Sequence, residues 1–234
     1  AVALSWSLDH FGVIAGSVDD AALVLGVARG EVGPPPAGQA RRIGVPRAAW
    51  QGVDAQVERA LELTIDSLVA SGCELVELDR PNAEDFDRAN LASIVVSRCE
   101  AAAYHDTLGL DRSLYSADIR AQLAATSAAT AQDFIDAQRL RQELRSDLTA
   151  VFDGVDVMLM PTVPIVAPPH EGAEKLPLVL TRNVAIWSFV GFPALSLPAG
   201  TPEGALPVGV QLVGPPWGEA AILSAGRAAE LTAR

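Results

Sequence analysis

The chain offers few residues that could do chemistry, and its lysine content is the most restrictive. Its 234 residues include one lysine, Lys175. A lysine can act as the base for a serine nucleophile only when its amine is desolvated enough to lose its proton. Lys175 follows Glu174 in a stretch rich in proline and glycine, where a carboxylate and solvent would keep it protonated. No serine stands three residues before it. The sequence therefore predicts a solvated loop charge here, and no serine–lysine machinery within this chain.

The histidines and cysteines do not form a pattern that would hold a metal or a cofactor. The three histidines are His10, His105 and His170, and no two of them are spaced for one helix face. The chain has no HExxH motif, no Walker loop, no GxSxG elbow and no GxGxxG motif after a strand. We therefore expect no metal and no cofactor. Cys73 and Cys99 form no CxxC pair, which favours reduced thiols in a cytoplasmic protein over a disulfide.

Carboxylates give weak candidates for acid–base work. Asp19 and Asp20 belong to the first turn of an expected helix, where negative charge suits the helix dipole. Glu100 stands in an alanine-rich helical stretch beside Tyr104. Its partial burial would fit either acid–base work or a structural hydrogen bond, and the composition around it favours the hydrogen bond.

The composition excludes some classes of partner. A net charge of −12 argues against a nucleic-acid groove, and 50% apolar residues are ample for a substantial core. No basic region followed by an apolar run opens the chain, so we expect no signal peptide. Residues 183–202 are uncharged and long enough to raise the question of a membrane span. Because prolines and glycines break that stretch into short pieces, we expect buried strands there and no membrane partner.

One segment predicts a parallel pair of strands joined by a helix. Ile43–Val45 and Cys73–Leu78 are short apolar runs typical of strands. Between them, apolar residues around Leu61 repeat at helical spacing, and Gly72 is well placed to stop that helix. A strand–helix–strand order favours neighbouring parallel strands.

Helices and buried strands alternate over the rest of the chain. Ser17 with Asp20, and Thr130 with Asp133, form two capping-box patterns that predict helix starts. Residues 83–132 are expected to be mostly helical, and a final helix is expected over residues 219–232. The remaining predicted elements are a strand at Val155–Met160, a helix or strand at Val184–Phe189, and strands at Ala194–Leu197 and Val208–Val213. This alternation predicts a three-layer α/β/α arrangement, with residues 1–234 as a single domain.

Six segments in fixed order give the chain a family resemblance. They are SWSLDHFG at 5–12, SVDDAA at 17–22, RIGVPR at 42–47, MPTVP at 160–164, GFPALSLPAG at 191–200 and LPVGVQLVG at 206–214. In this order they resemble the carboxyl-terminal half of amidase-signature enzymes. The resemblance implies a mixed central sheet and hydrolysis of a small amide through a Ser–Ser–Lys acyl-enzyme mechanism. The triad of that family lies on a Gly/Ser-rich stretch just upstream of the first segment, so the resemblance implies no catalytic residue in this chain.

The resemblance also implies a substrate site and partners. The loop after Met160 and the segment from Leu180 to Ser188 should border the substrate cleft. The expected substrate-binding residues are Thr162, Thr181, Arg182, Trp187 and Ser188. For each of them plain packing is the alternative, and for Trp187 burial in the core is an equally good interpretation. Arg182 could hold a substrate carboxylate with its cationic fork. The expected partners are a small amide and an upstream half of the same enzyme, with a homodimer as a further alternative.

The chain departs from the family pattern at several positions. Gly16 stands where the family usually has arginine before the SVDDAA helix, and Gly30-Glu31-Val32-Gly33 replaces a Gly-His-Asp-Pro-type turn. Pro215 and Gly218 stand where arginine and aspartate are common. These departures favour a free-standing amidase over the amidase-like component of a tRNA-dependent aminoacyl-tRNA amidotransferase. A degenerate, non-catalytic domain for binding or assembly stays open as a third hypothesis.

Overall fold

A five-stranded mixed sheet forms the centre of the chain. The computed structural model describes residues 3–31, 40–171, 176–200 and 205–230. The strands are β1 (Arg42–Pro46), β2 (Glu74–Leu78), β3 (Val157–Pro161), β4 (Ala194–Pro198) and β5 (Gly209–Val213). They lie in the order β2-β1-β3-β5-β4. The β1–β2 and β1–β3 pairs are parallel, whereas β3–β5 and β4–β5 are antiparallel. The mixed sheet expected from the sequence is therefore present.

The predicted strand–helix–strand unit is confirmed. Strands β1 and β2 are parallel neighbours, with Ile43 opposite Leu75, and helix α2 (Ala55–Ala70) connects them. Val57 and Leu61 are fully buried and belong to the core on one face of the sheet. Gly72 has a φ of +89°, which a residue with a side chain rarely adopts, and it lets the chain turn into β2.

The helices begin and end largely where local signals place them. Besides α2 they are α1 (Val18–Ala28), α3 (Ala83–Thr107), α4 (Ala117–Ala125), α5 (Ala131–Val151), α6 (Pro177–Thr181), α7 (Ala185–Val190) and α8 (Glu219–Glu230). Short 3₁₀ turns also occur in the connections, namely η1 (Arg47–Trp50), η2 (Arg112–Leu114) and η3 (Thr126–Ala128). Ser17 and Thr130 are N-caps as predicted, and Asn82 is an additional one with a reciprocal bond to Asp85. The segment that could have been helix or strand is helix α7, which ends at Gly191 with a φ of +74°.

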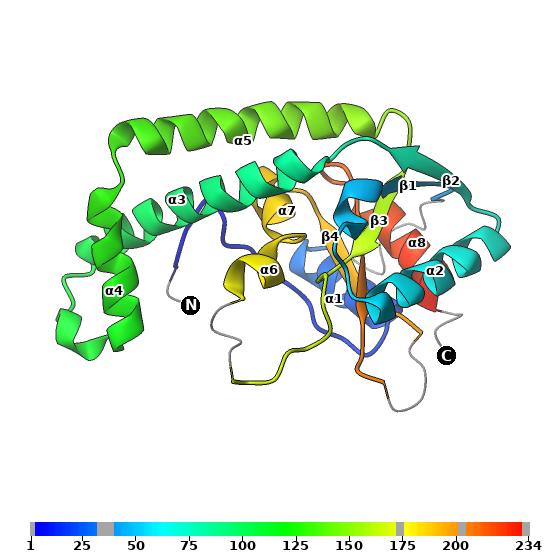
Figure 1. Ribbon diagram of the computed structural model, residues 1–234, viewed down its shortest axis with the longest axis horizontal. Helices are drawn as coiled ribbons and strands as arrows, with labels where there is room; N and C mark the ends of the chain where they lie inside the picture. The colour runs from blue at the N-terminus through cyan, green and yellow to red at the C-terminus, as the bar shows by residue number, and fades with distance from the viewer. Residues whose placement is uncertain (1–2, 32–39, 172–175, 201–204, 231–234) are drawn as a thin grey trace.

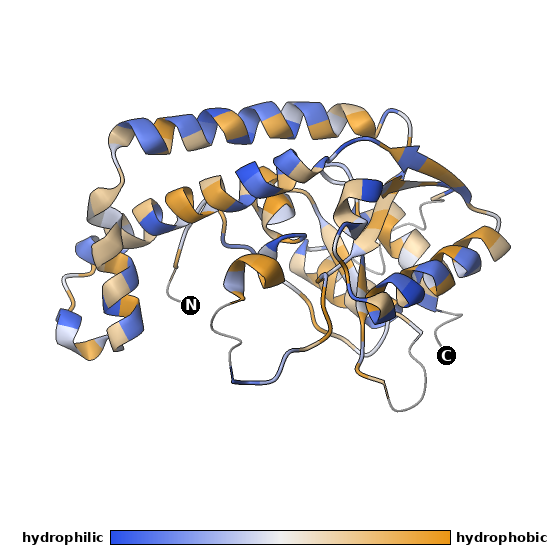
Figure 2. Cartoon of the chain, viewed as in Figure 1, coloured by the Kyte–Doolittle hydropathy of each residue, from blue (hydrophilic) through white to orange (hydrophobic). Residues whose placement is uncertain are grey.

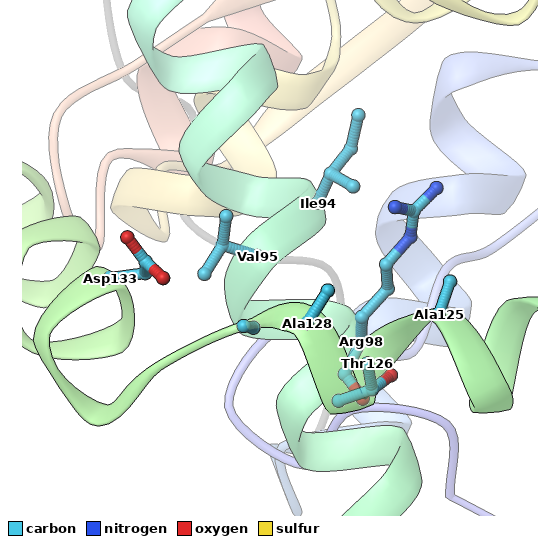
Figure 3. A pocket seen from close by; sticks show the side chains of 8 residues that line it. Ile94, Val95, Arg98, Ala125, Thr126, Ala128 and Asp133 are labelled. Atoms are coloured by element: carbon cyan, nitrogen blue, oxygen red, sulfur yellow. The ribbon is translucent and has the colours of Figure 1, made fainter.

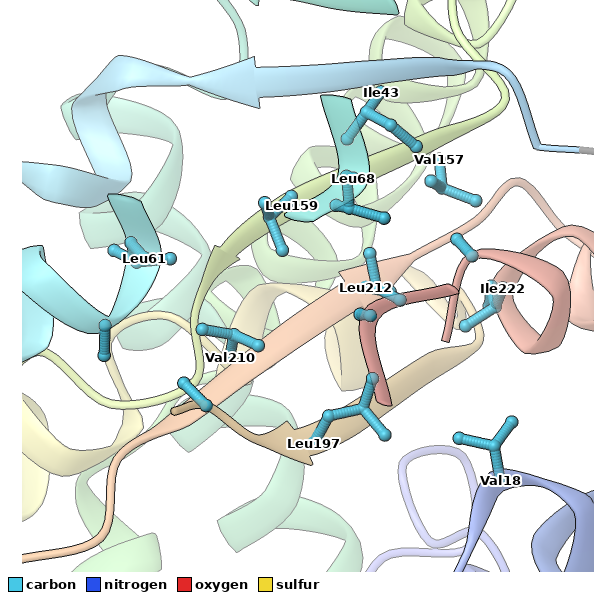
Figure 4. Close-up of a cluster of buried hydrophobic side chains, with 14 of the residues drawn as sticks. Val18, Ile43, Leu61, Leu68, Val157, Leu159, Leu197, Val210, Leu212 and Ile222 are labelled. Carbon is cyan, nitrogen blue, oxygen red and sulfur yellow. The ribbon is translucent and has the colours of Figure 1, made fainter. Parts of the chain in front are cut away.

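The sheet separates two apolar clusters, which confirms the three-layer architecture. Side chains alternate along β3: Val157 and Leu159 join the cluster under α1, α2 and α8 (Figure 4). Met158 and Met160 join the opposite cluster, under α3, α5 and α7. Helices thus cover both faces of the sheet, while the connection through α4 extends away from it (Figure 1).

Helix α5 illustrates how the outer layer meets solvent. Leu144 and Leu148 are fully buried, whereas the outward positions between them are polar. Figure 2 shows the resulting hydrophilic and hydrophobic stripes along this helix. Among the helices that the structure describes, no helix combines the length and the apolar character needed to cross a bilayer.

Candidate functional site

The loop at the carboxyl end of β3 is held by buried side-chain amides. The β1–β3 register covers Ile43–Val157 and Gly44–Met158, so Pro161 lies beyond the pairing with β1, although it is still opposite Val210 of β5. Its carbonyl instead accepts hydrogen bonds from Asn183 Nδ2 at 3.0 Å and Gln211 Nε2 at 3.3 Å. Both amide side chains are almost fully buried. Because a buried carbonyl without a donor is costly, these two amides fix the course of the chain where it leaves the sheet.

The same amides tie the α6–α7 segment to this loop. Gln211 Nε2 also donates to the main-chain carbonyl of Asn183 at 2.8 Å. Asn183 Nδ2 makes a longer contact of 3.4 Å with the carbonyl of Ala49, in the turn after β1. Residues from η1, β3, β5 and the α6–α7 connection therefore meet in one polar network inside an otherwise apolar layer.

Arg182 is committed to the main chain of the β1–α2 connection. Its Nη1 donates to the carbonyl of Gln51 at 2.9 Å and its Nη2 to the carbonyl of Ala49 at 3.3 Å. Its Nε donates to Asn183 Oδ1 at 3.1 Å. Burial lowers the pKa of this guanidinium, and the charge of Asp87 acts in the opposite direction. The expected role of Arg182 as a carboxylate-binding fork stays a prediction, and any ligand would share this cation with three acceptors of the fold.

Thr162 begins the loop after β3 and pairs with a hydroxyl of β4. Its N–H donates to the carbonyl of Gly209 at 3.0 Å, and its Oγ1 lies 2.8 Å from Ser196 Oγ. A Cβ at Gly209 would lie 3.1 Å from Thr162 Oγ1 and 3.2 Å from Ser196 Oγ. The bare backbone at this position leaves room for both hydroxyls, whose contact is exposed to solvent.

The other three expected substrate contacts lie on α6 and α7. Thr181 Oγ1 is 2.8 Å from the carbonyl of Pro177 and 3.1 Å from Asn90 Oδ1. Trp187 is 2% exposed and stacks on Phe192, with ring centroids 6.2 Å apart. Ser188 is half-buried in α7. Trp187 is therefore packed in the core, which was one of its two expected roles. Contact of Thr181, Trp187 or Ser188 with substrate stays a prediction.

With this geometry in view, comparison with known proteins decides the family. A family model described as Amidase matches residues 1–223. The chain belongs to the amidase family. It is 33% identical to a protein named Amidase from Pseudomonas putida, over 97% of this chain and 54% of that protein. It is 30% identical to the 2-amino-5-chloromuconic acid deaminase of Comamonas testosteroni, over 95% of this chain and 51% of that protein.

A solved structure agrees with this assignment. The structure, described as a crystal structure of amidase, is 30% identical and matches with a TM-score of 0.83. The match covers 98% of this chain and 54% of the solved chain. This amidase-family chain therefore spans about half the length of the relatives that it matches.

A second polar network in this amidase-family chain was only partly anticipated. Glu100 is 6% exposed, and its carboxylate accepts from Ser5 Oγ at 2.5 Å and from the N–H of Ser7 at 3.0 Å. The structural hydrogen bonds favoured from the sequence are thus present. Arg141 donates to Ser7 Oγ at 3.0 Å and to the carbonyl of Ser7 at 2.7 Å, and it also bonds the carbonyl of Phe189. Together these groups fasten the SWSLDHFG segment to α3, α5 and α7.

Sequence reasoning did not single out Asn183 or Gln211 as important residues. A signal for Gln211 was available, because it is the polar residue within the apolar run Val208–Val213. A buried polar side chain in a central strand requires partners, which points to a network. Asn183 gave no comparable signal, since its partners come from distant parts of the chain.

The remaining chemical candidates give no second catalytic or metal site. Lys175 lies outside the described residues. Within the described ranges no group of histidine, cysteine and carboxylate residues could hold a metal ion. Cys73 and Cys99 are free thiols, and burial raises the pKa of each. A cavity of about 210 Å³ between α3 and the α4–α5 connection is lined by residues such as Val95 and Arg98, and by none of the expected substrate contacts (Figure 3).

Proposed function

We propose that this chain is the carboxyl-terminal half of an amidase-signature amidohydrolase that hydrolyses a small amide. The observation that carries the proposal is the family match over residues 1–223 in a chain that spans about half of its relatives. In this proposal the Ser–Ser–Lys triad belongs to an upstream half, where a serine forms the acyl-enzyme and backbone amides hold the oxyanion. The present chain supplies part of the sheet and one wall of the substrate cleft.

The lysine content of the chain supports placing the catalytic triad on the upstream half. Lys175 is preceded by Glu174, which favours the protonated, non-basic form of the amine. We therefore expect the isolated chain to hydrolyse no amide. Purified 1–234 would be assayed with simple aliphatic and aryl amides, with Lys175→Ala as the matched variant. Turnover that disappears in Lys175→Ala would overturn this part of the proposal.

A sharper test adds the proposed upstream half. The chain would be co-expressed with the polypeptide encoded directly upstream, and amide hydrolysis by the purified pair would be measured. Hydrolysis that requires both polypeptides supports the half-enzyme proposal. A stable pair without activity on any amide would favour a degenerate binding or assembly domain. A pair that releases product only with charged tRNA would favour the amidotransferase alternative.

Arg182 has a more specific place in this proposal. Its guanidinium donates to Asn183, whose amide in turn binds the carbonyl of Pro161 at the end of β3, where the resemblance puts the cleft. Partial burial strengthens the attraction of this cation for a carboxylate. In the active pair, Arg182→Lys should raise KM for amides that carry a carboxylate by about 10-fold or more, with little change for neutral amides. Equal changes in KM for both classes would show that Arg182 only supports the fold.

A further inference from the structure

The cavity between α3 and the α4–α5 connection combines an apolar wall with access from solvent. Five of its lining side chains are apolar, namely Ile94, Val95, Ala125, Ala128 and Ala129. Ile94, Val95 and Ala129 are half-buried, whereas Ala125 and Ala128 are exposed, so the cavity opens at the surface. Thr126 Oγ1 donates to the carbonyl of Arg98 at 3.2 Å, which fastens the α4–α5 connection to α3. The wall is therefore held in place by the fold, and a small molecule has a way in.

Arg98 brings an uncommitted cation to this cavity. The residue is exposed, and no hydrogen bond or ion pair of the described residues engages its guanidinium. By contrast, nine other arginines in the described ranges form ion pairs with carboxylates. Carboxylates are plentiful in a chain with a net charge of −12, so an unpaired guanidinium stands out. Arg98 keeps its planar set of donors available for a carboxylate that the chain itself does not supply.

Asp133 brings the opposite charge to the same cavity. Its Oδ2 accepts from the N–H of Thr130 at 2.8 Å and from Thr130 Oγ1 at 2.7 Å, while its Oδ1 receives no hydrogen bond from the described residues. Figure 3 shows Asp133 on one side of Val95 and Arg98 on the other. Two opposite charges thus line one cavity, and no ion pair joins them.

We propose that this cavity binds a small ω-amino acid, whose carboxylate pairs with Arg98 and whose ammonium group pairs with Asp133. The methylene groups between the two charges contact Ile94 and Val95 and leave water. A simple anion fits less well because Asp133 repels it, and a simple cation fits less well because Arg98 repels it. In an α-amino acid the two charges are adjacent, which does not suit groups on opposite sides of Val95.

This proposal goes beyond the proposed function and does not depend on it. None of the expected substrate contacts lines the cavity. Binding is therefore measured directly, on the full chain alone and in the pair with the upstream polypeptide. The probe is 5-aminopentanoate, and its matched analogues are pentanoate, which lacks the ammonium group, and pentylamine, which lacks the carboxylate. The methyl resonances of Ile94 and Val95 report on the cavity in an NMR titration.

Three variants separate the two charges from the general charge of the surface. Arg98→Gln and Asp133→Asn each remove one charge from the cavity. Arg139→Gln removes the charge of another exposed arginine, on α5, that does not line the cavity. Circular dichroism and urea unfolding verify that each variant folds. Because the Arg98 side chain has no partner in the described chain to lose, Arg98→Gln should leave stability unchanged and decides the outcome even if Asp133→Asn disturbs the α5 cap.

We expect 5-aminopentanoate to bind at least about 5-fold more tightly than either analogue, and Arg98→Gln and Asp133→Asn each to weaken it by about 5-fold or more. Arg139→Gln should bind within about 2-fold of the wild type, and added salt should weaken binding because both charges lie near solvent. Equal binding of pentanoate or of pentylamine would overturn the zwitterion site. Binding that survives Arg98→Gln, or a titration that leaves the Ile94 and Val95 resonances in place, would overturn it as well. Amide hydrolysis by the pair tests the proposed function separately, so either proposal can fail while the other stands.

Discussion

The buried amides around Pro161 allow a quantitative test of the site's architecture. Asn183→Ala removes two donated bonds and the acceptor for Arg182 Nε, and Gln211→Ala removes two donated bonds. With a net contribution of about 1 kcal/mol for each hydrogen bond, the first variant should lose about 2–3 kcal/mol and the second about 2 kcal/mol. In either single variant the Pro161 carbonyl keeps one donor.

The double variant leaves that carbonyl without either side-chain donor. An unsatisfied buried acceptor costs about 1–3 kcal/mol, so the double variant should lose more stability than the sum of the two single variants by about that amount. Urea unfolding followed by tryptophan fluorescence measures all four proteins, and Trp187 in adjacent α7 is a buried reporter. Asn183→Ala combined with Asp133→Asn, on a separate helix, is the additive control. Additivity of Asn183→Ala and Gln211→Ala within about 0.5 kcal/mol would refute the shared-acceptor argument.

Three further predictions address other parts of the fold. Arg80→Ala should lower the free energy of unfolding in urea by about 2–3 kcal/mol, because it removes the bidentate partner of the buried Asp85 carboxylate. Asp147→Asn, at the more exposed partner of Arg80, should lower it by under about 1 kcal/mol. Hydrogen bonds from the α5 cap hold the pKa of Asp133 below its ordinary value, so the contribution of this carboxylate to the cap is fully present above about pH 4 and is lost as pH falls through the lowered pKa. Protection of the amides in the first turn of α5, corrected for their intrinsic exchange rates, should fall in that range, and Asp133→Asn should remove this pH dependence. Partial burial raises the pKa of Cys73, so iodoacetamide at pH 8 should alkylate it at least about 3-fold more slowly than in urea, and equal rates would contradict a shielded thiol.

Local signals in the sequence were sufficient to place most of the elements. The caps at Ser17 and Thr130 and the stop at Gly72 depend on residues close in the chain, and the structure has them where expected. The parallel pairing of β1 and β2 followed from the strand–helix–strand order. The order of β3, β5 and β4 is different, because it joins strands through antiparallel pairings that no turn signal specifies.

The candidate site was harder to predict, because its contacts join distant segments. Arg182 was chosen for its charge, but its partners Ala49 and Gln51 lie 133 and 131 residues away in the chain. Both acceptors are main-chain carbonyls, which every residue has, so no sequence pattern predicts these contacts. Trp187 could be assigned equally to the core or to a cleft wall, and its 2% exposure is set by Phe86 and Phe192 from separate elements.

Helix α1 illustrates what the structure adds to the sequence. Asp19 and Asp20 make the first turn of α1 polar, whereas the run Leu23-Val24-Leu25-Gly26-Val27 makes its second half apolar. The structure shows which side lacks cover, since Val18 and Ala22 are buried and Leu23 and Val27 are not. The sequence therefore gives the apolar character of these positions, and the structure decides which of them are covered by the rest of the described chain.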